Sequence, residues 1–124
     1  YARWCYWCKV MDKQTYKHDK VVEYINKKFY PVKFDAETRE TIQWKSQDFS
    51  FNKDAKMNEF SLYMTNGQLS FPTTVIYTSL NEAPAAIPGF MSPDEIEPVL
   101  KYFGEDIYRK KGFDEYLKNF KKDW

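Results

Sequence analysis

The only two cysteines of this 124-residue chain, Cys5 and Cys8, stand three positions apart near the start of the sequence. If residues 6–16 form a helix, Cys5 lies at its amino terminus and Cys8 lies one turn later on the same face, close enough for a disulfide. The unpaired N–H groups and the dipole at that end of a helix favour a thiolate, as do the nearby charges of Arg3 and Lys9. Because the thiolate is the attacking species in disulfide exchange, we predict that Cys5 is the nucleophile and Cys8 the resolving thiol.

Three other uses of the cysteine pair are less favoured. An inert structural disulfide would stabilise little, since so short a loop removes little entropy from the unfolded chain. A zinc site normally needs four ligands, and the only histidine, His18, is expected at the surface of a helix junction. Covalent haem attachment requires histidine directly after the second cysteine, where this chain has Lys9. No metal and no cofactor is therefore expected.

The side chains around the cysteines are aromatic, and Trp4, Tyr6 and Trp7 would offer a substrate an apolar platform. Aromatic residues must also fill the core, because Leu, Ile and Val together number only 17 beside ten Phe. The 19 basic and 18 acidic residues nearly cancel, which argues against a nucleic-acid partner. No apolar run approaches the roughly 18 residues of a membrane span, so direct membrane insertion of this segment is not expected.

Periodicity and turn residues predict the elements that position the pair. The strand at 73–78 is β-branched and nearly continuous, which favours a central place in a sheet. The aromatic residues of the hairpin at 41–52 are expected to form a local core rather than a client surface. The other predicted elements are a helix at 20–28 capped by Asp19, a strand at 29–35, a helix at 56–65, an edge strand at 83–87, a helix from Ser92 to about Phe103 with a Ser92–Glu95 capping box, and two short helices within 105–124.

The order of these elements resembles the thioredoxin fold. Four segments, residues 4–12, 32–37, 71–74 and 89–95, together resemble exported bacterial thioredoxin-related proteins with a W-C-x-W-C-K motif. The resemblance implies an α/β fold with a mixed sheet flanked by helices, an inserted β-hairpin and a C-terminal helical extension. Residues 1–124 would form a single thioredoxin-like domain.

The resemblance also assigns residues of the site. It makes Pro72 the cis-proline that faces an exposed active-site pair, with Phe71 offering backbone groups to an extended substrate segment. Gly89 corresponds to a loop glycine beside the site. The family's strand before the motif would lie upstream of Tyr1, so the chain is expected to be truncated at its amino end, or another chain supplies that strand.

The function that these features predict is a thiol-disulfide oxidoreductase acting on protein disulfides or dithiols, as a reductase or isomerase rather than an oxidase. Its partners would be those substrates and a redox partner, and the resemblance implies a periplasmic or cell-envelope location. One alternative is a non-enzymatic binding module whose aromatic surface holds clients. Another is a thioredoxin-like domain of a larger membrane electron-transfer protein.

Overall fold

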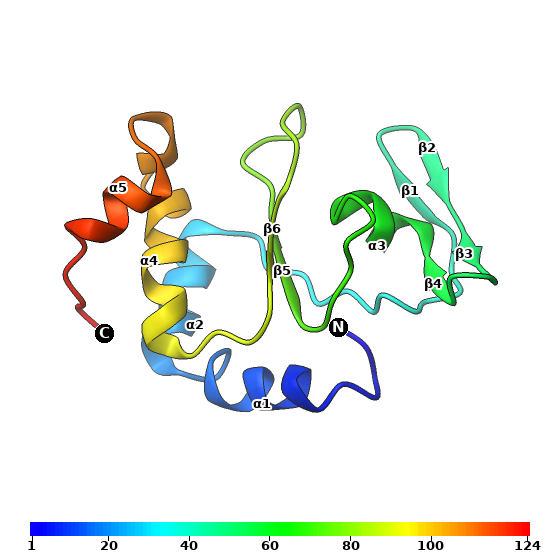
Figure 1. The fold of residues 1–124 in the computed structure, drawn as a ribbon, viewed down its shortest axis with the longest axis horizontal. Helices are drawn as coiled ribbons and strands as arrows, with labels where there is room; N and C mark the ends of the chain where they lie inside the picture. Colours follow the sequence, from blue (N-terminus) through cyan, green and yellow to red (C-terminus); the bar gives the residue numbers. More distant parts are fainter. The chain divides into compact units, whose positions relative to one another are not determined.

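The computed structural model describes all 124 residues (Figure 1). The chain forms two compact units. Unit 1 comprises residues 1–8 and 33–90, and unit 2 comprises residues 9–32 and 91–124. Helix α1 (Tyr6–Gln14) begins in unit 1 and continues into unit 2. None of the helices combines the length and the apolar character that crossing a membrane requires.

Unit 1 contains three sheets, and each consists of two antiparallel strands. The predicted α/β class is confirmed, but these separate pairs stand in place of one mixed sheet. Within residues 1–124, β5 pairs with β6 alone. The pairs are β1 (Ile42–Trp44) with β2 (Gln47–Phe49), β3 (Phe51–Asn52) with β4 (Met57–Asn58), and β5 (Thr73–Ile76) with β6 (Ala85–Pro88).

The predicted hairpin is confirmed as β1 and β2, with its second strand two residues earlier than expected. Lys45 and Ser46 form the turn with φ of 53° and 65°, the left-handed values that a two-residue hairpin loop requires. Phe49 is buried and its ring lies 5.2 Å from that of Phe60, which Trp44 also contacts. The expected local aromatic core is therefore confirmed.

Two predicted elements of the chain differ from the structure. Residues 29–35 form no strand. Tyr1 bonds to Phe34, but no strand pairs with the segment, and Tyr30 and Val32 are almost fully exposed. The helix predicted at 56–65 is only α3 (Glu59–Met64). It begins late because the side chain of the buried Asn58 accepts a hydrogen bond from the N–H of Phe60 and so caps the helix.

Unit 2 is helical, and α2 (Asp19–Lys28) packs against α4 (Pro93–Gly104). The capping box is confirmed: the hydroxyl of Ser92 accepts a hydrogen bond from the N–H of Glu95, and the carboxylate of Glu95 accepts one from the N–H of Ser92. Asp19 was predicted as the cap of α2, which is wrong. His18 holds that position without a side-chain bond, and Asp19 is the first helical residue, where its charge faces the positive helix end. The tail forms η1 (Ile107–Arg109) and α5 (Phe113–Lys118), as expected.

The end of the chain is held in unit 2 by the side chain of Glu97, which is 0% exposed. Its carboxylate accepts hydrogen bonds from the backbone N–H groups of Asp123, at 3.0 Å, and Trp124, at 3.3 Å. Lys101, one turn later on α4, places its Nζ 2.7 Å from the same carboxylate. The ammonium of Lys101 and the N–H groups of residues 123–124 are together the partners that make burial of this charge tolerable.

Alkaline pH should destabilise the protein through Tyr24. Burial, and then the hydrogen bond that its hydroxyl donates to Glu105 at 3.0 Å, raise the pKa of Tyr24 above its usual value. A group whose pKa is raised by folding contributes its full stability below the unfolded value near 10 and loses it as the pH rises toward the folded value. We expect the urea midpoint of Tyr24→Phe to fall less between pH 8 and pH 11 than that of the wild type. Tyr30→Phe, at a fully exposed position, is the matched control and should behave as the wild type does.

Candidate functional site

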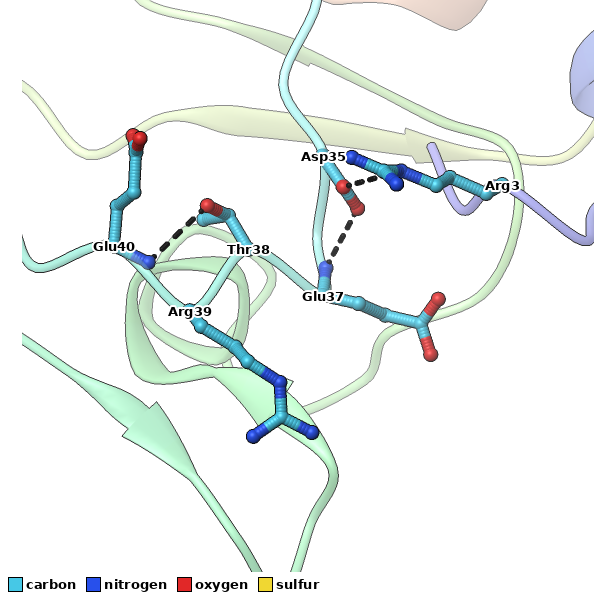
Figure 2. A pocket seen from close by; sticks show the side chains of 6 residues that line it. All are labelled: Arg3, Asp35, Glu37, Thr38, Arg39 and Glu40. Carbon is cyan, nitrogen blue, oxygen red and sulfur yellow. Dashed lines mark hydrogen bonds and ion pairs between the residues drawn. The ribbon is translucent and has the colours of Figure 1, made fainter.

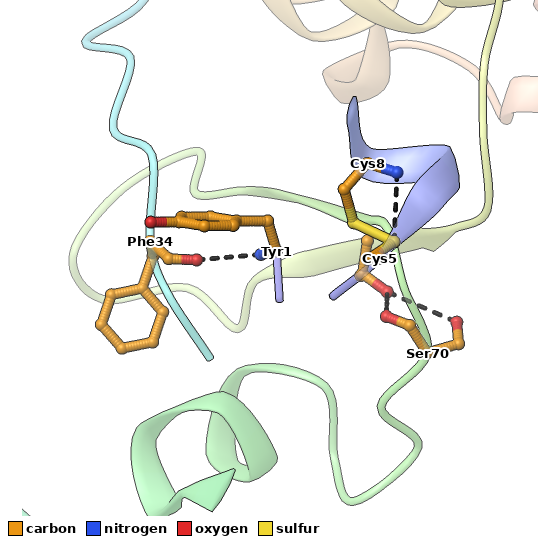
Figure 3. The surroundings of a disulfide bond; sticks show 6 residues. Tyr1, Cys5, Cys8, Phe34 and Ser70 are labelled. Atoms are coloured by element: carbon orange, nitrogen blue, oxygen red, sulfur yellow. Dashed lines mark hydrogen bonds between the residues drawn. A yellow bond between two sulfur atoms is a disulfide. The ribbon is translucent and has the colours of Figure 1, made fainter. Parts of the chain in front are cut away.

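The two cysteines form a disulfide at the start of α1 (Figure 3). Their Cα atoms are 5.3 Å apart, and Cys5 directly precedes the first helical residue. The N–H of Cys8 points at the sulfur of Cys5, with a distance of 3.1 Å between the nitrogen and Sγ. The predicted placement is therefore confirmed: Cys5 lies at the helix amino terminus, where the backbone N–H of Cys8 faces its sulfur.

Both cysteines are buried, with 4% of each residue exposed, so the prediction of an exposed pair is wrong. They form a cluster with Ala2, and Tyr1 and Phe71 pack against this cluster. The beginning of the chain is held in place because the amino group of Tyr1 donates to the carbonyl of Phe34 at 2.9 Å (Figure 3). The carbonyl of Tyr1 in turn accepts a hydrogen bond from Ala36. These contacts cover the pair in a way that residue types alone do not reveal.

The three aromatic residues of the motif are exposed around the buried disulfide. Trp4, Tyr6 and Trp7 have 64%, 68% and 53% of their surface accessible. Trp4 meets the ring of Phe71 edge-on, with centroids 5.2 Å apart and an interplanar angle of 82°. Tyr6 contacts Trp7 in the same manner. The side chains available to a substrate at this surface are therefore aromatic, although their predicted role in binding stays a prediction.

The loop that precedes β5 brings three further predicted residues together. The peptide bond between Phe71 and Pro72 is cis, as the resemblance implies. The N–H of Gly89 donates to the carbonyl of Pro72 at 2.7 Å, next to the pairing of β5 with β6. Gly89 has a φ of 96°, a value that residues with a side chain rarely adopt. The N–H and C=O of Phe71 make no hydrogen bond within the chain, and their predicted contact with a substrate segment stays a prediction.

Some residues of this region were missed by sequence reasoning. The ring of Phe90 lies 5.4 Å from that of Trp7 and extends the aromatic surface. The hydroxyl of Thr73 donates to the carbonyl of Ser70 at 2.6 Å and so fixes the turn that carries Phe71. Phe90 directly follows Gly89, so its place in the same segment was a usable signal. The turn at Ser70 had no comparable signal.

Arg3 was expected to favour a thiolate at Cys5, but it is engaged elsewhere. Its Nε lies 3.4 Å from the carboxylate of Asp35, and 85% of its side chain is exposed, so its effect on a nearby charge is screened. Arg3 and Asp35 line an open pocket of about 550 Å³, whose lining side chains are all polar or charged (Figure 2). None of the predicted site residues lines this pocket, whose remaining walls are Glu37, Thr38, Arg39 and Glu40.

No metal site accompanies the disulfide. The structure contains no group of three or more His, Cys, Asp or Glu residues arranged to hold a metal ion. His18 is partly buried at the junction before α2 rather than at the surface, and its Nδ1 has no hydrogen-bond partner.

A C-x-x-C disulfide at a helix amino terminus, with a cis-proline loop in an α/β chain, defines the thioredoxin-like class of redox site. The chain belongs to the thioredoxin-like domain family, whose sequence model matches residues 1–104. Comparisons with curated proteins and with solved structures gave no match. The family is thereby confirmed, whereas the narrower resemblance to exported proteins with a W-C-x-W-C-K motif stays a prediction.

Proposed function

We propose that the protein is a thiol-disulfide oxidoreductase that exchanges disulfides of client proteins. The observation that carries the proposal is the Cys5–Cys8 disulfide, with Cys5 placed at the amino terminus of α1. A helix amino terminus lowers the pKa of a cysteine thiol, because its N–H groups and dipole stabilise the anion. Membership of the thioredoxin-like family supports a redox role of this kind.

The reaction begins with the reduced protein. The thiolate of Cys5 attacks one sulfur of a client disulfide, whose other sulfur leaves as a thiolate and takes a proton. The thiolate of Cys8 then attacks Sγ of Cys5, which breaks the mixed disulfide and releases the second client thiol. The client has gained two electrons and two protons, and the protein holds the Cys5–Cys8 disulfide. A dithiol protein must reduce it again before the next cycle.

The proposal extends to direction and place. Reduction or isomerisation of client disulfides is favoured over oxidation, and the resemblance to exported relatives supports a periplasmic or cell-envelope location. A disulfide-exchanging protein has most clients in such an oxidising compartment. Fractionation of cells that carry the natural gene tests the location, and recovery from the cytosol alone would contradict it.

Titration of the reduced protein tests the proposal directly. The pKa of the Cys5 thiol should lie below the ordinary value of about 8.5, as measured by thiolate absorbance and by the pH dependence of alkylation. Cys5→Ser isolates the Cys8 signal for comparison. The reduced protein should also accelerate reduction of the insulin disulfides by dithiothreitol. An unshifted thiol together with no acceleration would refute the oxidoreductase.

The burial of both cysteines favours a second candidate function. In this candidate the exposed aromatic side chains Trp4, Tyr6 and Trp7 hold unfolded clients while the disulfide stays unused. If the protein is such a binding module, the wild type and the Cys5→Ser/Cys8→Ser variant should suppress aggregation of a reduced client equally well. Loss of that protection in the double variant would speak against the binding module.

A further inference from the structure

Phe71 packs beside the disulfide. Phe71 packs against the cluster of Ala2, Cys5 and Cys8, and the only other partly buried hydrophobic residue that does so is Tyr1. Tyr1 is tied down by backbone hydrogen bonds to Phe34 and Ala36. The side chain of Phe71 is restrained by no comparable bonds, and its ring meets the 64% exposed Trp4 edge-on. The contacts of the Phe71 ring are packing and aromatic contacts, so the ring can leave its position by rotation of its side chain.

Access to sulfur limits disulfide exchange. A thiolate must reach one sulfur of the disulfide, and each cysteine here is only 4% exposed. The turn beneath Phe71 is fixed by the bond from Thr73 to Ser70 and by the bond from Gly89 to Pro72. Displacing the ring by side-chain rotation leaves this backbone unchanged, and such rotations are fast at a partly exposed position.

We propose that the Phe71 side chain, held by Trp4, is a gate over the Cys5–Cys8 disulfide and selects client segments that carry an aromatic residue beside their cysteine. This inference rests on the proposed function and names its substrate class. When the gate opens, the ring loses its contact with Trp4 and uncovers an apolar surface. An aromatic client side chain restores that contact, whereas a small polar side chain does not.

A small dithiol tests the gate without any client. One thiolate of dithiothreitol attacks a sulfur of the Cys5–Cys8 disulfide, and its second thiol then displaces the protein sulfur. The protein gains two electrons and two protons while the reagent becomes a cyclic disulfide. We expect Phe71→Ala to raise this reduction rate about threefold or more, since an aromatic edge-to-face pair changes an equilibrium by a factor of about two to ten. Trp4→Ala, at an exposed position, should also raise the reduction rate. It provides a second test if Phe71→Ala folds poorly.

Phe51→Ala is the matched control, because Phe51 is partly buried in the same unit but packs with Arg39. It should leave the dithiothreitol rate unchanged. Equal rates in the wild type, Phe71→Ala and Trp4→Ala would overturn the gate, as would the same increase in Phe51→Ala. The rate of disulfide reduction does not require client activity, so this arm is informative even if the proposed oxidoreductase activity fails.

Selectivity is read with two disulfide-linked peptides that differ only in the residue before one cysteine, Phe in one and Ser in the other. The reduced wild type should prefer the Phe peptide about tenfold in kcat/KM, the lower range for burying one such side chain. In Phe71→Ala that preference should fall at least threefold. A preference that is absent in the wild type, or that Phe71→Ala leaves unchanged, would overturn the selection of aromatic clients.

Discussion

Cys8→Ser should accumulate a covalent complex with its client, whereas Cys5→Ser should show no more insulin reduction than the protein-free control. The asymmetry follows from the position of the two sulfurs, since Cys5 precedes α1 and Cys8 lies within it. Without Cys8 no second thiolate breaks the mixed disulfide at Cys5. Non-reducing gels and mass spectrometry of the intact complex measure the trapped species, and insulin turbidity measures the rate.

The two single variants control for each other, because each removes one buried sulfur and the same disulfide. Any loss of stability should be similar in both and is measured by chemical denaturation. Trapped complexes in Cys5→Ser rather than Cys8→Ser would reverse the roles. Equal residual activity in the two variants would remove the basis for assigning either role.

The largest loss of stability is expected from Glu97→Ala. The substitution removes the acceptor for the N–H groups of Asp123 and Trp124 and leaves Lys101 without its nearest carboxylate. Breaking a buried ion pair by removing one partner costs about 3–5 kcal/mol, and we expect about 3 because Lys101 can reach water. Urea denaturation measures the free energy of unfolding. Hydrogen exchange at the amides of residues 123 and 124 reports the local release.

Two further variants separate charge from shape at this position. Glu97→Gln keeps an oxygen acceptor and should cost about 1–2 kcal/mol. Asp94→Ala removes the partner of Lys122 in a surface ion pair, where both side chains are more than half exposed, and should cost less than about 1 kcal/mol. If Glu97→Ala proves as mild as Asp94→Ala, the buried carboxylate does not anchor the tail.

Local rules predicted the parts of the fold whose causes are local. The capping box at Ser92, the hairpin within residues 41–52 and the position of Cys5 before a helix each depend on a few consecutive residues. The cis bond at Pro72 and the nearby Gly89 came from family resemblance rather than from physics. These two sources together located the redox pair and the loop beside it.

What the sequence could not predict depends on contacts between distant segments. The burial of the cysteines arises from Tyr1, whose partners lie more than 30 positions away, and from Phe71. The late start of α3 depends on Asn58, whose amide also donates to the carbonyls of Thr38 and Glu40. Residues 29–35 alternate as a strand should, but no partner strand pairs with them, so the pattern alone predicted too much.

The anchoring of residues 123 and 124 bears on how the domain should be produced for experiments. The family match ends at residue 104, and that boundary would be the natural choice for a minimal recombinant fragment. Such a fragment would contain Glu97 without the two amides that solvate it in the interior. Poor expression or aggregation of that fragment would then reflect the lost hydrogen bonds to the buried carboxylate of Glu97 rather than a defect of the redox site.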